Sequence, residues 1–217
     1  MSNARNVIVF TALAVCVLLF ILLQVLNVHL VVRIAANALL FAVVPLVVLR
    51  HLKQPWTFFT FTRLEKKSLV LGLGVFLAIL LGNFLFKQFI DTDGVIAQLG
   101  AIGITLDTYL WVALHVIVVN SFLEELFFRG FSFLALKPHA PWAGWFSAAL
   151  FSVYHVAIFG AWFVWWVMGI ALVGLFVGGL IFNWLNAKSG TIYNSWFVHI
   201  MADVGVIVVG LNWFGVF

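Results

Sequence analysis

The stretch that decides the fold is residues 108–136, TYLWVALHVIVVNSFLEELFFRGFSFLAL. It is long and apolar enough for a bilayer-spanning helix, which needs about 20 mainly apolar residues. Yet Glu124, Glu125 and Arg129 lie near its middle. An ionisable side chain at mid-bilayer costs about 2.5–3.5 kcal/mol on insertion scales, so such residues normally mark a functional site. The stretch therefore predicts a membrane-spanning helix with a functional site inside it.

The whole chain shares this preference for lipid. Of its 217 residues, 65% are hydrophobic and 8% are charged, and the mean hydropathy is +1.21. A soluble domain has about 25% charged residues, so this chain lacks the polar surface of a soluble protein. The net charge of +4 is explained by loop charges that set membrane topology, and it gives no reason to expect a nucleic-acid partner.

Six further apolar runs accompany the central stretch. The first is longer than the apolar core of a signal peptide, which has about 7–15 residues, so it is interpreted as a span. The sequence thus predicts an all-α fold, a polytopic integral membrane bundle of about seven helices, and a break near Gly205 or Gly210 would make eight. The seven predicted spans are 7–26, 30–49, 68–90, 108–136, 142–158, 162–186 and 191–214.

The loop between the second and third spans indicates the orientation. It carries five basic residues and the single acid Glu65. Basic loops stay in the cytoplasm, so the N-terminus and this loop are predicted to be cytoplasmic. The five basic residues are Arg50, Lys53, Arg63, Lys66 and Lys67.

Helical spacing sorts the acids of the central span into two faces. Glu125 and Arg129 are four residues apart, so they can pair along the helix. Glu124 points about 100° away and has no basic residue four positions away. The pattern predicts one neutralised carboxylate and one free carboxylate. The alternative is that both acids belong to a structural network with Arg129.

Two later spans add histidines and a third buried acid. His199 and Asp203 are four residues apart and share a helix face, an arrangement typical of a supporting carboxylate or a co-ligand, or of a simple buried pair. His155 follows Phe151 by four residues, and it is either a structural residue or a ligand. His115 is predicted to lie on the face opposite Glu124 and to be structural.

The rise per residue of an α-helix predicts that these groups lie at comparable depths, where they can converge. Counted from the turn at 137–141, Glu124 is level with residue 153, and His155 and His199 lie within roughly 10 Å of that depth. A divalent metal such as zinc, bound by both histidines with Glu124 or Asp203, would lower the pKa of a bound water to about 7. Alternatively, Glu124 would act as general base while the histidines stabilise an oxyanion. Both routes hydrolyse an amide bond.

The three polar patterns together resemble the motifs of a known family. Residues 124–130, EELFFRG, resemble its EExxxR motif, residues 151–155, FSVYH, its FxxxH motif, and residues 199–203, HIMAD, its HxxxN/D motif. The family is CPBP, the CAAX-protease and bacteriocin-processing (Abi) membrane proteins. The resemblance covers about residues 115–205, with three motifs in the family's order on three separate helices.

The resemblance implies an intramembrane endopeptidase of metallo or glutamic type. In it, Glu124 would be the water-activating base, and Asp203 would support His155 and His199, which bind the metal or the oxyanion. Glu125 and Arg129, with Phe151, would support the site structurally. Family members that process prenylated CAAX proteins in eukaryotes typically have asparagine at the last motif position. This chain has Asp203 there, as many bacterial members have aspartate. The implied substrate is therefore a membrane-embedded or lipid-anchored protein or peptide.

The resemblance also implies an organisation for the chain. Residues 1–217 form a single transmembrane domain, with variable spans in 1–106 and the catalytic core in 107–217. A compact chain fits a prokaryotic member, so the expected location is a prokaryotic plasma membrane. Three other functions stay open at this point: a bacteriocin self-immunity protein, a proton-coupled transporter with an acid and histidine relay, and a lipid-modifying enzyme.

Overall fold

The computed structural model describes residues 2–160 and 162–217, and within them the regular structure is helical. Six helices are long and apolar enough to cross a membrane, and Ala143–Phe159 is a shorter apolar helix. The all-α prediction is confirmed, and the seven predicted spans appear in order, one of them too short for a full crossing. The six long helices are Asn3–Val25, Leu30–His51, Lys66–Phe89, Leu106–Ala135, Trp165–Ser189 and Tyr193–Trp213.

Several spans combine α-helical and π-helical segments. The first span consists of α1 (Ser2–Phe20) and the π-helical turn Ile21–Val25. The second span consists of α2 (Leu30–Ala38), the π-helical turn Leu39–Val43 and α3 (Val44–His51), and the third contains α4 (Lys66–Phe86). The connection to the central span contains α5 (Thr92–Ala101), a helix that the hydropathy pattern did not predict. Asp91 caps it by accepting a hydrogen bond from the Gly94 amide at 3.0 Å.

The second half contains the central span and three further helices. The last helix runs unbroken through Gly205 and Gly210 within the described residues, so the eighth helix is not formed. The bounds are α6 (Leu106–Leu114), the π-helical segment His115–Asn120, α7 (Ser121–Glu124), the π-helical segment Glu125–Ala135, α8 (Ala143–Tyr154), α9 (Val156–Phe159), α10 (Trp165–Ser189) and α11 (Tyr193–Trp213).

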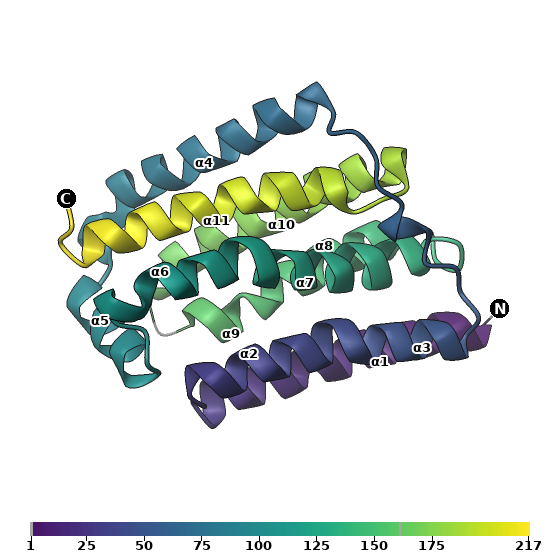
Figure 1. Cartoon of the computed structure of the whole chain (residues 1–217), viewed down its shortest axis with the longest axis horizontal. Coiled ribbons are helices and arrows are strands. Elements are labelled where there is room, and N and C mark those ends of the chain that lie inside the picture. Colours follow the sequence, from purple (N-terminus) through teal and green to yellow (C-terminus); the bar gives the residue numbers. More distant parts are fainter. Residues whose placement is uncertain (1, 161) are drawn as a thin grey trace.

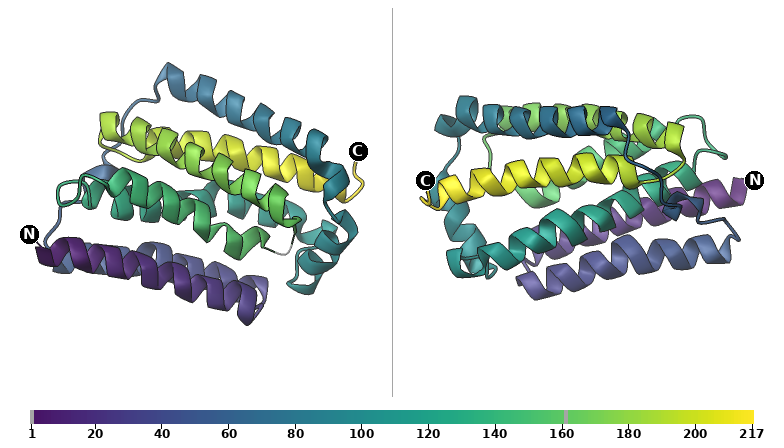
Figure 2. Two further views of the ribbon diagram at one scale, coloured as in Figure 1. Left: turned by 180° about the vertical axis from the view of Figure 1, so that it is seen from behind. Right: turned by 45° about the horizontal axis from the view of Figure 1, so that its top comes forward.

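The helices form three rows across the bundle (Figure 1). Helices α1–α3 lie along one side, α6–α9 occupy the middle, and α4, α10 and α11 cover the other side, as the views in Figure 2 also show. Helix α11 packs against α4, and α10 packs against α8. The two ends of the chain lie at opposite ends of the bundle, consistent with an odd number of crossings. The middle row therefore lies between the other two.

An aromatic cluster joins the first row to the middle row. The fully buried ring of Phe41 lies 4.7 Å from Phe127, 5.5 Å from Phe128 and 5.1 Å from Tyr154, measured between ring centroids. Burial of such large rings is a main source of packing energy. The second span is thus held firmly against the helix that carries the two acids.

The basic loop is tied to the start of the last helix. The buried Phe58 accepts a hydrogen bond from the Ile192 amide at 3.2 Å, and the Tyr193 hydroxyl donates to the Phe59 carbonyl at 3.2 Å. The ring of Phe58 also packs against Gly130, where an added Cβ would lie 3.0 Å from the ring. These contacts set the position of α11 relative to the central span.

Candidate active site

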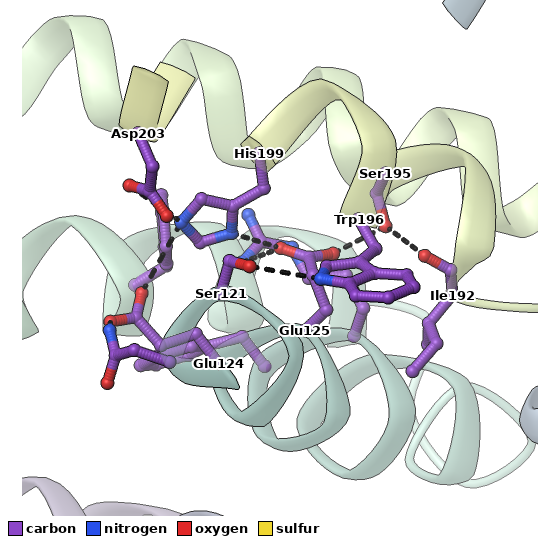
Figure 3. A network of polar contacts seen from close by, with 12 residues as sticks. Ser121, Glu124, Glu125, Ile192, Ser195, Trp196, His199 and Asp203 are labelled. Atoms are coloured by element: carbon purple, nitrogen blue, oxygen red, sulfur yellow. Dashed lines mark hydrogen bonds and ion pairs between the residues drawn. The ribbon is translucent and has the colours of Figure 1, made fainter. Parts of the chain in front are cut away.

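The predicted site residues gather in the middle of the bundle. Glu124 ends α7, Glu125 begins the π-helical segment Glu125–Ala135, and His155 follows α8. His199 and Asp203 come from α11 (Figure 3). The two glutamates and two histidines are at most 7% exposed. The residues that sequence spacing placed at comparable depth are therefore buried at the junction of three helices.

The helix changes its winding between the two acids. From Glu125 onward the backbone hydrogen bonds run from i to i+5, whereas Ser121–Glu124 is α-helical. Such wide turns are rare and are concentrated at functional sites. Because of this change, a simple 3.6-residue period does not describe how side chains beyond Glu125 are arranged around the axis.

His199 lies between the two neighbouring glutamates. Its Nδ1 is 2.9 Å from Glu125 Oε1, and its Nε2 is 3.7 Å from Glu124 Oε2. A carboxylate accepts hydrogen bonds, so Nδ1 carries the hydrogen and the ring is held in one orientation. Nε2 is therefore the nitrogen that faces the free carboxylate of Glu124.

Asp203 lies on the same side of the imidazole as Glu124. Its Oδ1 is 3.9 Å from His199 Nε2. The hydrogen bond that orients the ring is made with Glu125 and not with Asp203. The role of Asp203 as a support for the histidines stays a prediction. Spacing of four residues correctly brought Asp203 to the same face as His199, but it did not specify which ring nitrogen the carboxylate meets.

Glu125 is the centre of a buried polar network. Arg129 Nη1 lies 3.2 Å from its Oε1, so the predicted pairing along the helix is present. Its Oε2 accepts a hydrogen bond from Ser195 Oγ, and the Asn186 amide in turn donates to Ser195 at 2.6 Å. A buried charge requires this kind of compensation, since an unpaired one is strongly destabilising.

Arg129 is held between two aromatic rings. Its guanidinium carbon lies 4.0 Å from the centroid of Phe151 and 4.7 Å from that of Phe182, distances typical of cation–π contacts. Within the described residues its nitrogens have no hydrogen-bond partner. The rings and Glu125 therefore stabilise a cation that is fully buried.

Phe151 also organises both histidines. His155 Nδ1 donates a hydrogen bond to the Phe151 carbonyl at 2.7 Å, so Nε2 of His155 is left for other partners. The Phe151 ring lies 4.5 Å from the His155 ring and 5.8 Å from the His199 ring, both near edge-to-face. One phenylalanine thus contacts the arginine and both imidazoles.

Glu124 has one bonded and one unbonded oxygen. Oε1 accepts a hydrogen bond from the Asn120 amide at 2.8 Å. Within the described part of the chain, Oε2 of Glu124 and Oδ2 of Asp203 are buried and have no hydrogen-bond partner. Buried polar atoms normally find a partner, and a water or a bound substrate can supply one to these two oxygens. The unbonded oxygen of Glu124 is also the one that faces His199 Nε2.

The donor types suit zinc, which binds imidazole nitrogen and carboxylate oxygen. In the described residues, however, no three histidine, cysteine or acidic side chains are arranged to hold one metal ion together. Glu124 Oε2 and Asp203 Oδ1 nevertheless lie 3.7 Å and 3.9 Å from His199 Nε2. A zinc ion held by His155 and His199 with an acidic partner therefore stays a prediction.

Several residues outside the predicted set belong to this network. Ser195 and Phe182 contact the Glu125–Arg129 pair, and Asn186 bonds Ser195. None of the three was singled out from the sequence for this role. Asn186 is a polar residue in an apolar run, which is a detectable signal, whereas Phe182 is one of 24 phenylalanines. Among the described residues, no hydrogen bond or ion pair joins His115 to the cluster.

A comparison with known protein families supports the three motifs that form this candidate site. Residues 106–205 match the model of a family described as Type II CAAX prenyl endopeptidase Rce1-like. The match runs from α6 into α11 and includes all three motifs, so the resemblance to CPBP family intramembrane proteases is confirmed over this stretch. No curated protein and no solved structure matches the chain.

Proposed function

We propose that this integral membrane protein is an intramembrane endopeptidase in which Glu124 activates water. The observation that carries the proposal is the position of Glu124 Oε2, which lies 3.7 Å from His199 Nε2 and has no hydrogen-bond partner among the described residues. A water that bridges two such groups is oriented by both and can lose a proton to the carboxylate. The similarity of residues 106–205 to CAAX endopeptidases supports the same reaction.

The chemistry proceeds by addition of water to a peptide carbonyl. Glu124 takes one proton of the water while the water oxygen forms a bond to the carbonyl carbon. The carbonyl oxygen becomes an oxyanion, which Nε2–H of a protonated His199 or His155 can stabilise. Glu124 then returns its proton to the amine nitrogen as the peptide C–N bond breaks, which yields an acid and an amine.

Three carboxylates surround the imidazole of His199. Glu125 bonds Nδ1, while Glu124 and Asp203 face Nε2. In this scheme Asp203 acts on the reacting side of the ring, and Glu125 with Arg129 and Phe151 holds the ring in place.

The substrate class follows from where the site lies. The acids and histidines are buried within apolar helices that are long enough to span a membrane. A peptide bond that reaches this position belongs to a membrane-embedded or lipid-anchored protein or peptide. The family description adds prenylated proteins with a CAAX terminus as the class to examine first.

The decisive experiment compares the purified wild type with Glu124→Ala in detergent. The substrates are a library of membrane peptides and a farnesylated CAAX peptide, and cleavage is read by mass spectrometry. We expect the wild type to cleave and Glu124→Ala to be inactive although folded. Glu65→Ala, which changes a partly exposed loop acid paired with Lys67, is the control and should retain activity. Equal cleavage by wild type and Glu124→Ala would remove Glu124 as the base, and binding without cleavage would favour a self-immunity protein.

A further inference from the structure

A chain of amide hydrogen bonds connects the second span to Glu124. The Asn37 amide nitrogen donates to Asn120 Oδ1 at 2.9 Å, and the Asn120 amide nitrogen donates to Glu124 Oε1 at 2.8 Å. Asn37 lies in α2, which belongs to the part of the chain that was predicted to vary and to contribute no site residue. The two asparagines are 83 positions apart in sequence.

The direction of this chain is determined by the carboxylate at its end. An ionised Glu124 only accepts hydrogen bonds, so Asn120 must turn its NH₂ group toward it. The Asn120 oxygen then faces α2, where it needs a donor. Asn37 supplies that donor, and its own Oδ1 is left buried without a partner in the described residues. The amide of Asn37 therefore selects the orientation of Asn120 that serves Glu124.

The position of Asn37 is set by the packing of its own helix. Phe41, four residues further on, is fully buried against Phe127 and Phe128 of the central span. Phe41 lies in the π-helical turn Leu39–Val43, which follows Asn37 directly in the same span, so its burial holds this part of the span against the helix that carries Asn120. The first span is also bonded to the middle row, since the Gln24 amide donates to the Ala157 carbonyl at 2.8 Å.

We propose that Asn37 is a positioning residue for the reaction, acting through Asn120 on Glu124. Oε1 of Glu124 is occupied by Asn120, which leaves Oε2 directed at His199 Nε2 at 3.7 Å. Loss of Asn37 frees the Asn120 amide to turn and to present its oxygen to the carboxylate, which would displace Glu124. The inference rests on the proposed function because it assigns a role in the same site.

The kinetic test uses Asn37→Leu, which keeps the size of the side chain and removes its donor. We expect kcat per folded molecule to fall about tenfold or more with KM unchanged, as for the loss of a hydrogen bond to a charged group. Asn37→Gln keeps the amide and should recover part of the loss. The matched control is Asn183→Leu, because Asn183 is also an asparagine whose amide bonds between helices, through Gly144 O at 2.7 Å. That control should lower thermal stability while kcat stays near the wild-type value.

A second measurement reports on Glu124 without any catalysis. A membrane-permeant carbodiimide reacts with accessible, protonated carboxyl groups, and mass spectrometry locates the modified residue. We expect Glu124 to be modified severalfold faster in Asn37→Leu and in Asn120→Leu than in the wild type, and at the wild-type rate in Asn183→Leu. This readout separates the two proposals, since faster modification in a protein that never cleaves would support the link from Asn37 through Asn120 to Glu124 and would remove the reaction that this link was proposed to serve.

Two results would overturn the role of Asn37. One is a wild-type modification rate at Glu124 in folded Asn37→Leu. The other is an equal fall of kcat in Asn37→Leu and Asn183→Leu, which would show that Asn37 only holds helices together, as asparagines in membrane proteins often do.

Discussion

His199 Nδ1 donates its hydrogen to Glu125 Oε1 at 2.9 Å, across 74 positions of sequence. This single contact decides which nitrogen of the imidazole faces the free carboxylate. It also couples the reacting side of the site to the buried ion pair behind it, because the same Glu125 oxygen lies 3.2 Å from Arg129 Nη1. The stability of the bundle and the geometry of the site therefore depend on the same residue.

Removal of one partner of the Glu125–Arg129 ion pair is predicted to lower the stability of the protein strongly. Glu125→Leu leaves the fully buried Arg129 without its carboxylate, and breaking a buried pair in this way costs about 3–5 kcal/mol. We expect low yield and a lowered Tm in detergent, together with reduced activity. In the double variant with Arg129→Leu part of the stability should return, since neither charge is then left alone. A double variant no more stable than the single one would contradict the pairing.

Ser195 is predicted to support the site although sequence reasoning passed over that role. Ser195→Ala removes a donor to Glu125 and leaves the Asn186 amide unbonded. The loss of a hydrogen bond to a charged group is worth about 1.5–3 kcal/mol. A thermal melt should show this loss, and kcat should fall with it. Ser152→Ala is the comparison, because Ser152 donates only to the Leu172 carbonyl, and a similar effect there would show that any buried serine behaves in the same way.

The histidines are predicted to act on the reacting atoms. His155→Ala and His199→Ala should each lower kcat by about 10²-fold or more, the cost typical of a lost oxyanion donor. Steady-state cleavage of the best peptide substrate measures this. His115→Ala is the control, since His115 lies outside the polar cluster. A change under about threefold for either site histidine would exclude it from the reaction.

Chelation distinguishes the two routes that the residue types allow. The glutamic route, in which Glu124 activates the water without a metal, predicts that EDTA and 1,10-phenanthroline leave cleavage unchanged. Metal analysis of the purified protein gives an independent reading. Loss of activity with a chelator, restored by zinc, would instead assign a metal to His155 and His199 with an acidic partner.

Much of the fold was predictable because lipid imposes simple requirements. A bilayer offers no partners for backbone polar groups, so each long apolar run has to be a helix. The same reasoning identified Glu124, Glu125, Arg129, His155, His199 and Asp203, since ionisable residues are costly in such runs. The short helix α5 was missed because it lies in a connecting segment.

Other parts of the site were not predictable from spacing. Helical period placed Asp203 on the face of His199, but the orienting partner proved to be Glu125. Asn37 lies in a span that resembled any hydrophobic helix, and Phe182 could not be told from the many other phenylalanines. Each of these contacts joins segments that are far apart in the chain.

The amino-acid sequence by itself determined the membrane-spanning helices, their order and the polar residues buried within them. The reason is that the free energy of placing a segment in a bilayer depends on its hydropathy and charge, which are local properties. Only the tertiary structure decided how each helix is rotated and which atoms meet. Rotation depends on the packing of rings such as Phe41 and Phe151 against distant helices. That packing directs Glu125 to one nitrogen of His199 and Glu124 to the other. It also brings Asn37 to Asn120, which donates to Glu124.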